Sequence, residues 1–407
     1  MGTEFLKIKE YSEAKDIIND LFDKYYTPLN EEVYVKDSYS RILFQDVYSL
    51  MDYPSFNKAL KDGFAIKSED SYGANEENPN TLKIIDFLEA GFISEKSVEK
   101  GKCIEISTGA PIPDGADSVA MVEYTNKHGD EVDILKSITP FNEIAKKGSD
   151  MKESNLLLKK KDFLNPGKIG VLLSQGFEKV EVFKKPIVGV ISTGNEIISQ
   201  NDELSYGKIY DVNCEMIKNS IISFGAIGKS FGIVKDDYDS LKLKIQNSLK
   251  EVDILICSGG TSAGLGDVLK QVLDELGEVH IHGISVQPGK PTIVAEVNNK
   301  IVIGLPGNPV SAIVIFNVFI APQIAKLLGF NLNLSKKTIK AKLSKKIHSS
   351  VGRLQYQLVK FRDGFVEPIF KDSGAIFSLS EADGYVKVLK SVELVDEKEE
   401  VEVYLFD

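Results

Sequence analysis

The spacing of hydrophobic positions changes three times along the chain. Near the N-terminus, Ile17, Ile18, Leu21 and Phe22 recur at helical spacing after Ser12, which predicts an amphipathic helix capped by that serine. From residue 33 to about residue 184, short β-like runs such as 81–87 and 118–122 are separated by turns rich in Gly, Pro, Asn and Asp. This region is expected to be mostly β, with one helical turn at 166–175.

Residues 185–329 show strands that alternate with helices. Continuous apolar runs at 187–192, 227–234, 253–257 and 301–305 predict strands, and further apolar runs lie at 279–286 and 292–297. Helices are expected at 213–224, 238–250 and 267–276, and a long one from Pro309. Such alternation implies crossover connections, so we expect a three-layer α/β domain with a mostly parallel sheet.

After residue 329 the pattern returns to alternating strands. These are expected at 338–343, 355–361, 365–368, 384–389 and 401–406, which together predict a small all-β terminal domain.

Composition and charge narrow the class of protein. At 407 residues the chain is longer than one hydrophobic core usually organises, and its 43% apolar and 27% charged residues are typical of a globular protein. The net charge of -11 argues against nucleic acid as a partner. Three dispersed cysteines favour neither disulfides nor zinc. The start lacks a signal pattern and the run at 310–320 is too short to span a bilayer, so we expect a cytoplasmic protein without a membrane partner.

Candidate chemistry gathers in three turns that follow predicted strands. They are Ser-Thr-Gly-Asn-Glu at 192–196, the glycine-rich segment 258–267, and Leu-Pro-Gly-Asn-Pro-Val-Ser at 305–311. Ligands of open parallel sheets bind outside the carboxyl ends of the strands, where the strand order reverses. We therefore expect Glu196, Gly260 and Asn308 to converge at one edge and to hold the phosphates of a nucleotide. Taken alone, the first turn is equally well explained as a polar loop.

The glycine-rich turn is the most informative of the three. Its glycines allow backbone N–H groups to approach an anion, and Thr261 and Ser262 add hydroxyl donors. The spacing matches neither the dinucleotide GxGxxG fingerprint nor the P-loop. Asn308 is expected to cap the helix that begins at Pro309.

Isolated charged residues stand beside these turns. Glu196, Asp236 and Asp267 offer the carboxylates that Mg²⁺ takes beside phosphates, and Lys290 offers a point charge suited to phosphate. His280 and His282 share one face of a predicted strand, and without a third ligand we favour a structural role over a metal site. The absence of a GxSxG elbow leaves covalent acyl chemistry unsupported.

Several motifs together resemble the MoeA family over essentially the whole chain. Asp62-Gly63-Phe64-Ala65 is similar to the family's Asp-Gly-Tyr-Ala segment, and residues 107–117 are similar to its Thr-Gly-Ala-Pro segment. Ser-Thr-Gly-Asn-Glu, Ile-Tyr-Asp-Val-Asn at 209–213, Ser-Gly-Gly-Thr-Ser, Pro-Gly-Lys-Pro and Leu-Pro-Gly-Asn-Pro-Val-Ser then follow in family order.

The resemblance implies a molybdopterin molybdenumtransferase. Such an enzyme inserts molybdate or tungstate into adenylated molybdopterin with Mg²⁺ and releases AMP. The resemblance also implies a homodimer, a cooperating adenylyltransferase of the same pathway, and four domains. These are a discontinuous linker-like domain (1–45 plus 145–184), a β-rich domain (46–144), a molybdopterin-binding α/β domain (185–329) and a C-terminal β-barrel (330–407).

Site residues carried over by motif fall into two groups. The catalytic candidates are Asp62, Thr108, Glu196, Asp236, Asp267 and Arg353, of which Glu196, Asp236 and Asp267 are also the expected metal ligands. Asp62, Thr108 and Arg353 are expected to line the cleft from neighbouring domains, with Thr108 and Arg353 as oxyanion donors. The cofactor-binding candidates are Thr193, Gly194, Gly259, Gly260, Thr261, Ser262, Lys290, Pro306, Asn308 and Ser311.

The chain departs from the family pattern at a few positions. Gly283 and Gln287 stand where some members have lysines, and Gly374 stands where some have serine. Lys61, beside Asp62, is expected to compensate in part. Two other functions stay open: a nucleotide pyrophosphatase built on a related α/β domain, and a non-catalytic dimeric scaffold.

Overall fold

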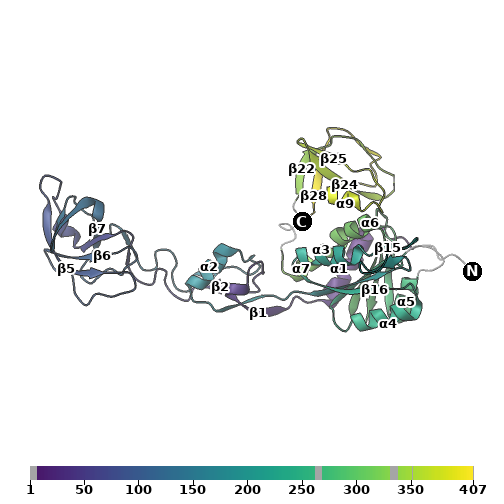
Figure 1. Ribbon diagram of the computed structural model, residues 1–407, viewed down its shortest axis with the longest axis horizontal. Helices are drawn as coiled ribbons and strands as arrows, with labels where there is room; N and C mark the ends of the chain where they lie inside the picture. Colours follow the sequence, from purple (N-terminus) through teal and green to yellow (C-terminus); the bar gives the residue numbers. More distant parts are fainter. Residues whose placement is uncertain (1–6, 262–267, 331–337, 351, 407) are drawn as a thin grey trace, which may run out of the picture. The chain divides into compact units, whose positions relative to one another are not determined.

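The computed structural model describes residues 7–261, 268–330, 338–350 and 352–406 (Figure 1). The chain forms two compact units. One unit combines residues 1–45, 161–164 and 179–407, and the other combines residues 46–160 and 165–178. Each unit is therefore built from separate stretches of sequence. The finer division into four domains stays a prediction.

A six-stranded sheet in the order β16-β13-β17-β21-β20-β18 forms the centre of the first unit. The strands are β13 (Ile187–Thr193), β16 (Ile227–Val234), β17 (Ile254–Ser258), β18 (Glu278–His282), β20 (Ile293–Val297) and β21 (Lys300–Leu305). The first four strands of that order are parallel, whereas β20 pairs antiparallel with both β21 and β18. The reversal occurs at Asn298 and Asn299, which both have the positive φ that a two-residue hairpin turn requires. The predicted α/β character of this region is confirmed.

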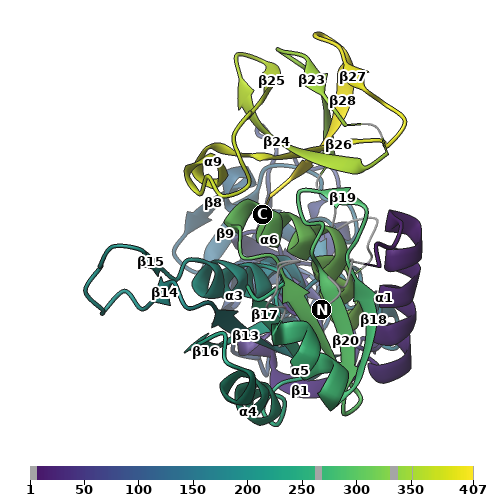
Figure 2. The ribbon, with the colours of Figure 1, turned by 90° about the vertical axis from the view of Figure 1, so that its right-hand side faces the viewer.

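Helices cover both faces of this sheet (Figure 2). On one face, α1 (Tyr11–Tyr25), α3 (Asn213–Ser223) and α6 (Pro309–Ile315) pack around Val188 and Val190. On the other face, α4 (Tyr238–Ser248) and α5 (Val268–Leu276) pack around Leu255 and Cys257. The short strands β14 (Ile197–Ile198) and β15 (Ile209–Tyr210) pair beside the end of β13.

The first helix begins one residue before the serine that was expected to cap it. Its N-cap is Glu10, whose carbonyl accepts a hydrogen bond from the Ala14 N–H at 2.9 Å, and no side chain caps the helix. Ser12 therefore lies inside the first turn, and the predicted serine cap is wrong. The helical spacing of the apolar residues correctly predicted which face of the helix is buried, because Ile18, Leu21 and Phe22 are all buried.

A 19-residue helical segment, Pro309–Leu327, follows the last strand of this sheet. It consists of α6, the π-helical turn η4 (Phe316–Ile320) and α7 (Ala321–Leu327). By length and composition it could cross a membrane, which corrects the expectation of a shorter run. However, 78% of it is buried inside the protein, as is typical of a core helix.

The C-terminal sheet has the order β19-β24-β26-β28-β22, with β25 paired to β24. Its strands are β19 (Val286–Gln287), β22 (Thr338–Lys342), β24 (Leu354–Arg362), β25 (Phe365–Pro368), β26 (Gly384–Val388) and β28 (Glu400–Leu405). β23 (Ile347–His348) and β27 (Leu394–Val395) form a separate pair, and α9 spans Phe377–Glu381. One bridge joins Leu343 to Val366, so the described residues show no continuous ladder that closes the predicted barrel.

The strand β19 was not anticipated as a separate element. The apolar run at 279–286 divides after β18, and β19 leaves the α/β sheet to pair with β24, Val286 opposite Leu354. The run therefore does not form one continuous strand. A further ribbon of this unit pairs β1 (Asn30–Tyr34) with β12 (Lys179–Phe183), near the 3-10 turn η1 (Val35–Asp37).

The second unit is mostly β, as predicted. Its main sheet has the order β7-β4-β6-β5-β9-β8, with separate apolar clusters around Ala65 and Phe64. These strands are β4 (Gly63–Ile66), β5 (Asn80–Leu88), β6 (Lys102–Ile106), β7 (Ser118–Met121), β8 (Thr125–His128) and β9 (Glu131–Ile134). The smaller elements are β2 (Val47–Tyr48), β3 (Lys58–Ala59), β10 (Ile144–Ala145), β11 (Leu156–Leu158), η2 (Ser68–Ser71), η3 (Val122–Tyr124) and α2 (Pro166–Ser174). Asn165 caps α2 by accepting the Lys168 N–H at 2.9 Å.

Candidate functional site

Three candidate loops leave the same edge of the α/β sheet. The strands β13, β17 and β21 are adjacent and parallel, with Ser192 opposite Ser258 and Ser258 opposite Leu305. The loops that carry Glu196, Gly260 and Asn308 therefore start from one edge, as expected from the sequence. Their role in binding stays a prediction.

The strand order reverses at this edge. After β13 the chain enters α3 on one face of the sheet, whereas after β17 it continues to α5 on the opposite face. Connections that diverge from neighbouring parallel strands leave a crevice between the strand ends, where ligands of such sheets bind. This switch point, here called the strand-end crevice, lies between the ends of β13 and β17.

Gly259 brings the glycine-rich loop into contact with the end of β13. Its φ is +102°, and a Cβ at this position would lie 2.1 Å from the carbonyl oxygen of Thr193. Its N–H donates to the Leu305 carbonyl at 3.0 Å, so the loop is fixed against both neighbouring strands. Thr261 is buried behind it, while Ser262 and Asp267 lie outside the described residues.

Two carboxylates stand beside this contact. The hydroxyl of Thr193 donates to Oδ1 of Asp236 at 2.5 Å, and the Asp236 N–H donates to Oδ1 of Asn195 at 3.3 Å. Glu196 is exposed, but its Oε2 lies 2.8 Å from where a Cβ on Gly194 would be, so this carboxylate folds back over the strand end. The structure thus places Thr193, Gly194 and both carboxylates together.

A buried polar network behind the loops was missed as part of the site. Oδ1 of Asp211 accepts the Ser192 hydroxyl at 2.8 Å and the Cys214 N–H at 3.1 Å. Nδ2 of Asn213 donates to Oγ of Ser258 at 2.8 Å and to the Gly307 carbonyl at 2.7 Å. From the sequence, residues 209–213 counted only as a family motif, because the partners Ser192, Ser258 and Gly307 are 19 to 94 residues away.

A pocket of about 460 Å³ lies on the other side of the 305–308 loop. Five predicted residues line it: Lys290, Pro306, Asn308, Ser311 and Arg353. Other lining residues were not predicted, including Gln287, Gln355, Gln357, Lys371, Asp372 and Ser373. In the part of the chain that the structure describes, no carboxylate forms an ion pair with Lys290 or Arg353. The pocket is therefore electropositive and rich in hydrogen-bond donors.

Asn308 has a different role from the expected one. It is the N-cap residue of α6, but its side chain makes no capping hydrogen bond. Its Nδ2 donates instead to Oγ of Ser373 at 2.9 Å, on the far side of the pocket. The predicted N-cap position of Asn308 and the place of Pro309 in the first helical turn are therefore confirmed, but the capping hydrogen bond is absent. Gly374 lies next to this contact, because a Cβ there would be 3.7 Å from Oδ1 of Asn308.

Asp62 and Thr108 lie in the second unit, apart from the other candidates in sequence and in compact unit. Oδ1 of Asp62 accepts the Thr108 N–H at 2.7 Å and the Thr108 hydroxyl at 2.8 Å. These two hydrogen bonds lower the pKa of Asp62 below its usual value. Thr108 thus orients Asp62, and Lys61 beside it is exposed. The contribution of all three to a cleft stays a prediction.

His280 belongs to a cluster on the edge strand β18. It lies 3.8 Å from Glu278 and 3.6 Å from Glu296, and potential ligand atoms of the three residues are within 4.8 Å of one another. The ammonium of Lys24 lies 3.6 Å from the same Glu296 carboxylate. A cation already beside that carboxylate favours an ion-pair cluster over a metal site, so we keep the structural interpretation.

Comparison with known families gives three matches that together cover most of the chain. Residues 9–176 match the MoeA N-terminal region (domain I and II), residues 189–326 match a probable molybdopterin binding domain, and residues 340–406 match the MoeA C-terminal region (domain IV). The division between the first two matches falls close to β13.

Individual proteins are similar over nearly the full length. A putative molybdopterin biosynthesis protein of Methanocaldococcus jannaschii is 34% identical over 98% of this chain and 99% of its own. A molybdopterin molybdenumtransferase of Staphylococcus epidermidis is 33% identical over 92% of this chain and 90% of its own. The crystal structure of a molybdopterin biosynthesis MoeA protein from Pyrococcus horikoshii is 37% identical, with a TM-score of 0.87 over 98% of this chain and 100% of that one.

Proposed function

Because this chain belongs to the MoeA family, we propose that it is a molybdopterin molybdenumtransferase that inserts molybdate or tungstate into adenylated molybdopterin and releases AMP. One observation supports this most directly. The loop 305–308 borders two different sites of the same unit. Its Leu305 and Gly307 carbonyls hold Gly259 and Asn213 at the strand-end crevice, while its Pro306 and Asn308 line the electropositive pocket.

The strand-end crevice suits the nucleotide end of the substrate. Gly259 and Gly260 leave no side chain between the backbone and an approaching phosphate, and Thr193, whose hydroxyl donates to Asp236, lies against both glycines. These residues would bind and orient the pyrophosphate that is cleaved when AMP leaves. Ser262 is proposed to contribute from the same loop.

The carboxylates at the end of β13 fit a hard cation. Oδ1 of Asp236 is held by Thr193, and among the described residues its second oxygen has no hydrogen-bond partner. Glu196 and Asp236 are therefore proposed to hold Mg²⁺ together with Asp267. When bound, this ion would neutralise charge on the pyrophosphate.

The pocket suits the oxyanion. Molybdate and tungstate are dianions, which bind through charge-assisted hydrogen bonds, and Lys290, Arg353 and the Ser311 hydroxyl supply such donors. Because one loop separates this pocket from the crevice, both substrates would be held side by side, which is catalysis by proximity. Asp62 and Thr108 are proposed to complete the cleft.

The test combines purified protein with adenylated molybdopterin, Mg²⁺ and each oxyanion in turn, and measures AMP and active cofactor. We expect both products to form and to depend on the oxyanion. AMP release without any oxyanion requirement would favour the pyrophosphatase alternative. No AMP with either anion would contradict metal insertion and favour a scaffold.

A pair of variants locates the reaction. Asp236→Asn should reduce AMP release at least about a hundredfold, since removing one preorganised charge from an active site commonly costs that much. Asp239→Asn is the matched control, because Asp239 is exposed on the first turn of α4, three residues away. Equal activity of both variants would contradict the proposed crevice.

The setting of the reaction is also proposed. We infer a cytoplasmic homodimer that receives its substrate from the adenylyltransferase of the same pathway. Light scattering of the purified protein tests the dimer. Transfer of adenylated molybdopterin between the two purified enzymes, followed by pull-down, tests the partner.

A further inference from the structure

Lys371 brings a third cation to the electropositive pocket. It lies between β25 and α9, two residues before Ser373, and both residues line the pocket. The other lining charges are Lys290, Arg353 and Asp372. Without Lys371 the lining carries one net positive charge, and with it two. Two positive charges match a dianion such as molybdate.

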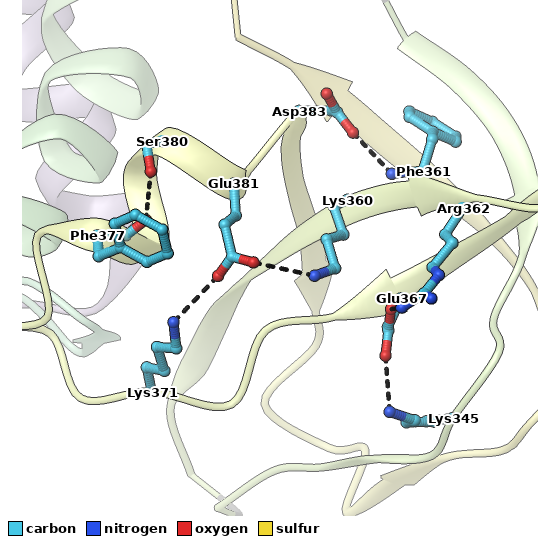
Figure 3. Close-up of polar contacts among 10 residues, drawn as sticks. All are labelled: Lys345, Lys360, Phe361, Arg362, Glu367, Lys371, Phe377, Ser380, Glu381 and Asp383. Carbon is cyan, nitrogen blue, oxygen red and sulfur yellow. Dashed lines mark hydrogen bonds and ion pairs between the residues drawn. The ribbon is translucent and has the colours of Figure 1, made fainter.

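The ammonium of Lys371 has two partners beside the pocket, Glu381 and Phe377 (Figure 3). Its Nζ lies 3.0 Å from Oε2 of Glu381 and 5.0 Å from the ring centroid of Phe377. An ammonium has three N–H donors, so one hydrogen bond to Glu381 leaves donors for a ligand.

Glu381 does not cancel the positive charge of this group. Its other oxygen, Oε1, lies 3.1 Å from Nζ of Lys360, so one carboxylate is shared by two lysines. The three side chains retain one net positive charge. The carboxylate therefore orients Lys371 while the surroundings of the pocket stay electropositive.

We propose that Lys371, positioned by Glu381, is a third cationic ligand of the oxyanion that occupies this pocket. This inference rests on the proposed function, since it takes the oxyanion to be molybdate or tungstate. Lys371 would donate directly to the oxyanion, and Glu381 is a positioning residue that acts through it.

The same β-rich region offers a matched control. Lys345 forms an ion pair with Glu367 at 2.6 Å, and Glu367 lies near Arg362 in a second shared-carboxylate cluster (Figure 3). Lys345 does not line the pocket. Lys345→Gln therefore removes the same charge from the same part of the chain without reaching the ligand.

The experiment measures molybdate binding to the full chain by isothermal titration calorimetry at low ionic strength, with circular dichroism to verify folding. Lys371→Gln should raise the Kd for molybdate about tenfold, the usual effect of losing one charge-assisted hydrogen bond. Lys371→Arg should stay within about threefold of the unsubstituted protein. Lys345→Gln should leave the Kd unchanged. Unchanged binding by Lys371→Gln, or an equal loss in Lys345→Gln, would overturn the proposal.

The Glu381→Gln variant distinguishes the orienting effect of Glu381 on Lys371 from its effect on the net charge near the pocket. If Glu381 orients Lys371, its loss should weaken binding about threefold, although a negative charge has been removed. Tighter binding by this variant would overturn the positioning role. In turnover, Lys371→Gln should raise KM for molybdate while KM for adenylated molybdopterin stays constant. Because the binding arm needs no turnover, a protein that binds molybdate through Lys371 but releases no AMP would contradict the proposed function alone.

Discussion

The side-chain amide of Asn308 donates a hydrogen bond to the hydroxyl of Ser373 across 2.9 Å. The two residues are 65 positions apart in the sequence. Asn308 precedes α6 of the α/β part, and Ser373 lies in the loop before α9 of the C-terminal β part. This bond joins the α/β part of the pocket to its C-terminal β part. It also explains why Asn308 occupies the N-cap position of α6 but makes no capping hydrogen bond with its side chain.

A double-mutant cycle tests this contact. Asn308→Ala and Ser373→Ala should each lower the free energy of unfolding by about 0.5–1 kcal/mol, and the double variant should lose less than their sum by a similar amount. Urea unfolding followed by circular dichroism gives the four values. Strictly additive losses would mean that the two side chains do not interact in solution.

The buried network at Asn213 should matter more for stability. Asn213→Ala removes the buried amide that donates to the Ser258 hydroxyl and to the Gly307 carbonyl. The free energy of unfolding should therefore fall by about 2–3 kcal/mol. Asn219→Ala is the control, because Asn219 is exposed on the same helix, and it should cost no more than about 0.5 kcal/mol. Similar losses in both variants would argue against the network.

Gly259 is expected to tolerate no side chain. Gly259→Ala meets both a φ of +102° and a carbonyl oxygen 2.1 Å from the new Cβ, so the loop or β13 must shift. Gly207→Ala shares only the conformational cost, since its φ is +82° and nothing lies within 4 Å. We expect a loss of about 1 kcal/mol for Gly207→Ala and at least about 3 kcal/mol for Gly259→Ala in the free energy of unfolding. Thermal unfolding of the two variants provides the comparison, and equal losses would contradict the close approach.

The acid titration of Asp62 should depend on Thr108. The backbone N–H of Thr108 is the larger cause of the lowered pKa of Asp62, and its hydroxyl is the second. A depressed pKa means that these hydrogen bonds stabilise the folded chain above the ordinary pKa of 3.8 and that this stabilisation is lost as the pH falls through the lower, folded-state pKa. Thr108→Val should therefore raise the pKa of Asp62 part of the way toward 3.8.

Carbonyl-carbon NMR titration of aspartate side chains measures this change. Thr125→Val is the matched control, because the Thr125 hydroxyl donates to the Val122 carbonyl at 3.1 Å in the same unit. It should leave Asp62 unchanged. An unaltered Asp62 titration in Thr108→Val would show that the hydroxyl does not reach the carboxylate in solution.

The sequence predicted those parts of the fold that depend on local pattern. The helices and the parallel strands of the α/β region follow from apolar periodicity, and the shared edge of the three loops follows from parallel strand order. The antiparallel hairpin of β20 and β21 could have been recognised from Asn298-Asn299, since asparagine tolerates the positive φ of both turn positions. The apolar runs alone do not report strand direction, so the alternation of strands and helices favours crossovers here as well.

Other parts depend on contacts between distant residues. The Asn308 side chain makes no capping hydrogen bond because it donates to Ser373. Gln355 and Gln357 line the pocket from β24, which pairs with β19, and Lys371 lines it from the segment between β25 and α9. No periodicity reports such pairings. Lys290 was predicted from its charge beside the candidate turns and Arg353 from the family resemblance, whereas Lys371 belongs to neither and is recognised only from the three-dimensional structure.

The exchange of β19 between sheets limits how this protein can be divided. Val286 and Gln287 come from the middle of the α/β segment, yet they supply the edge strand that pairs with Leu354 and Gln355. A fragment that begins after Gly329 would expose that edge backbone to water and to other chains. A chimaera that takes its C-terminal β part from a relative would therefore also need Val286 and Gln287 from that relative. The backbone hydrogen bonds between β19 and β24 thus link the sequence of the α/β part to that of the C-terminal part.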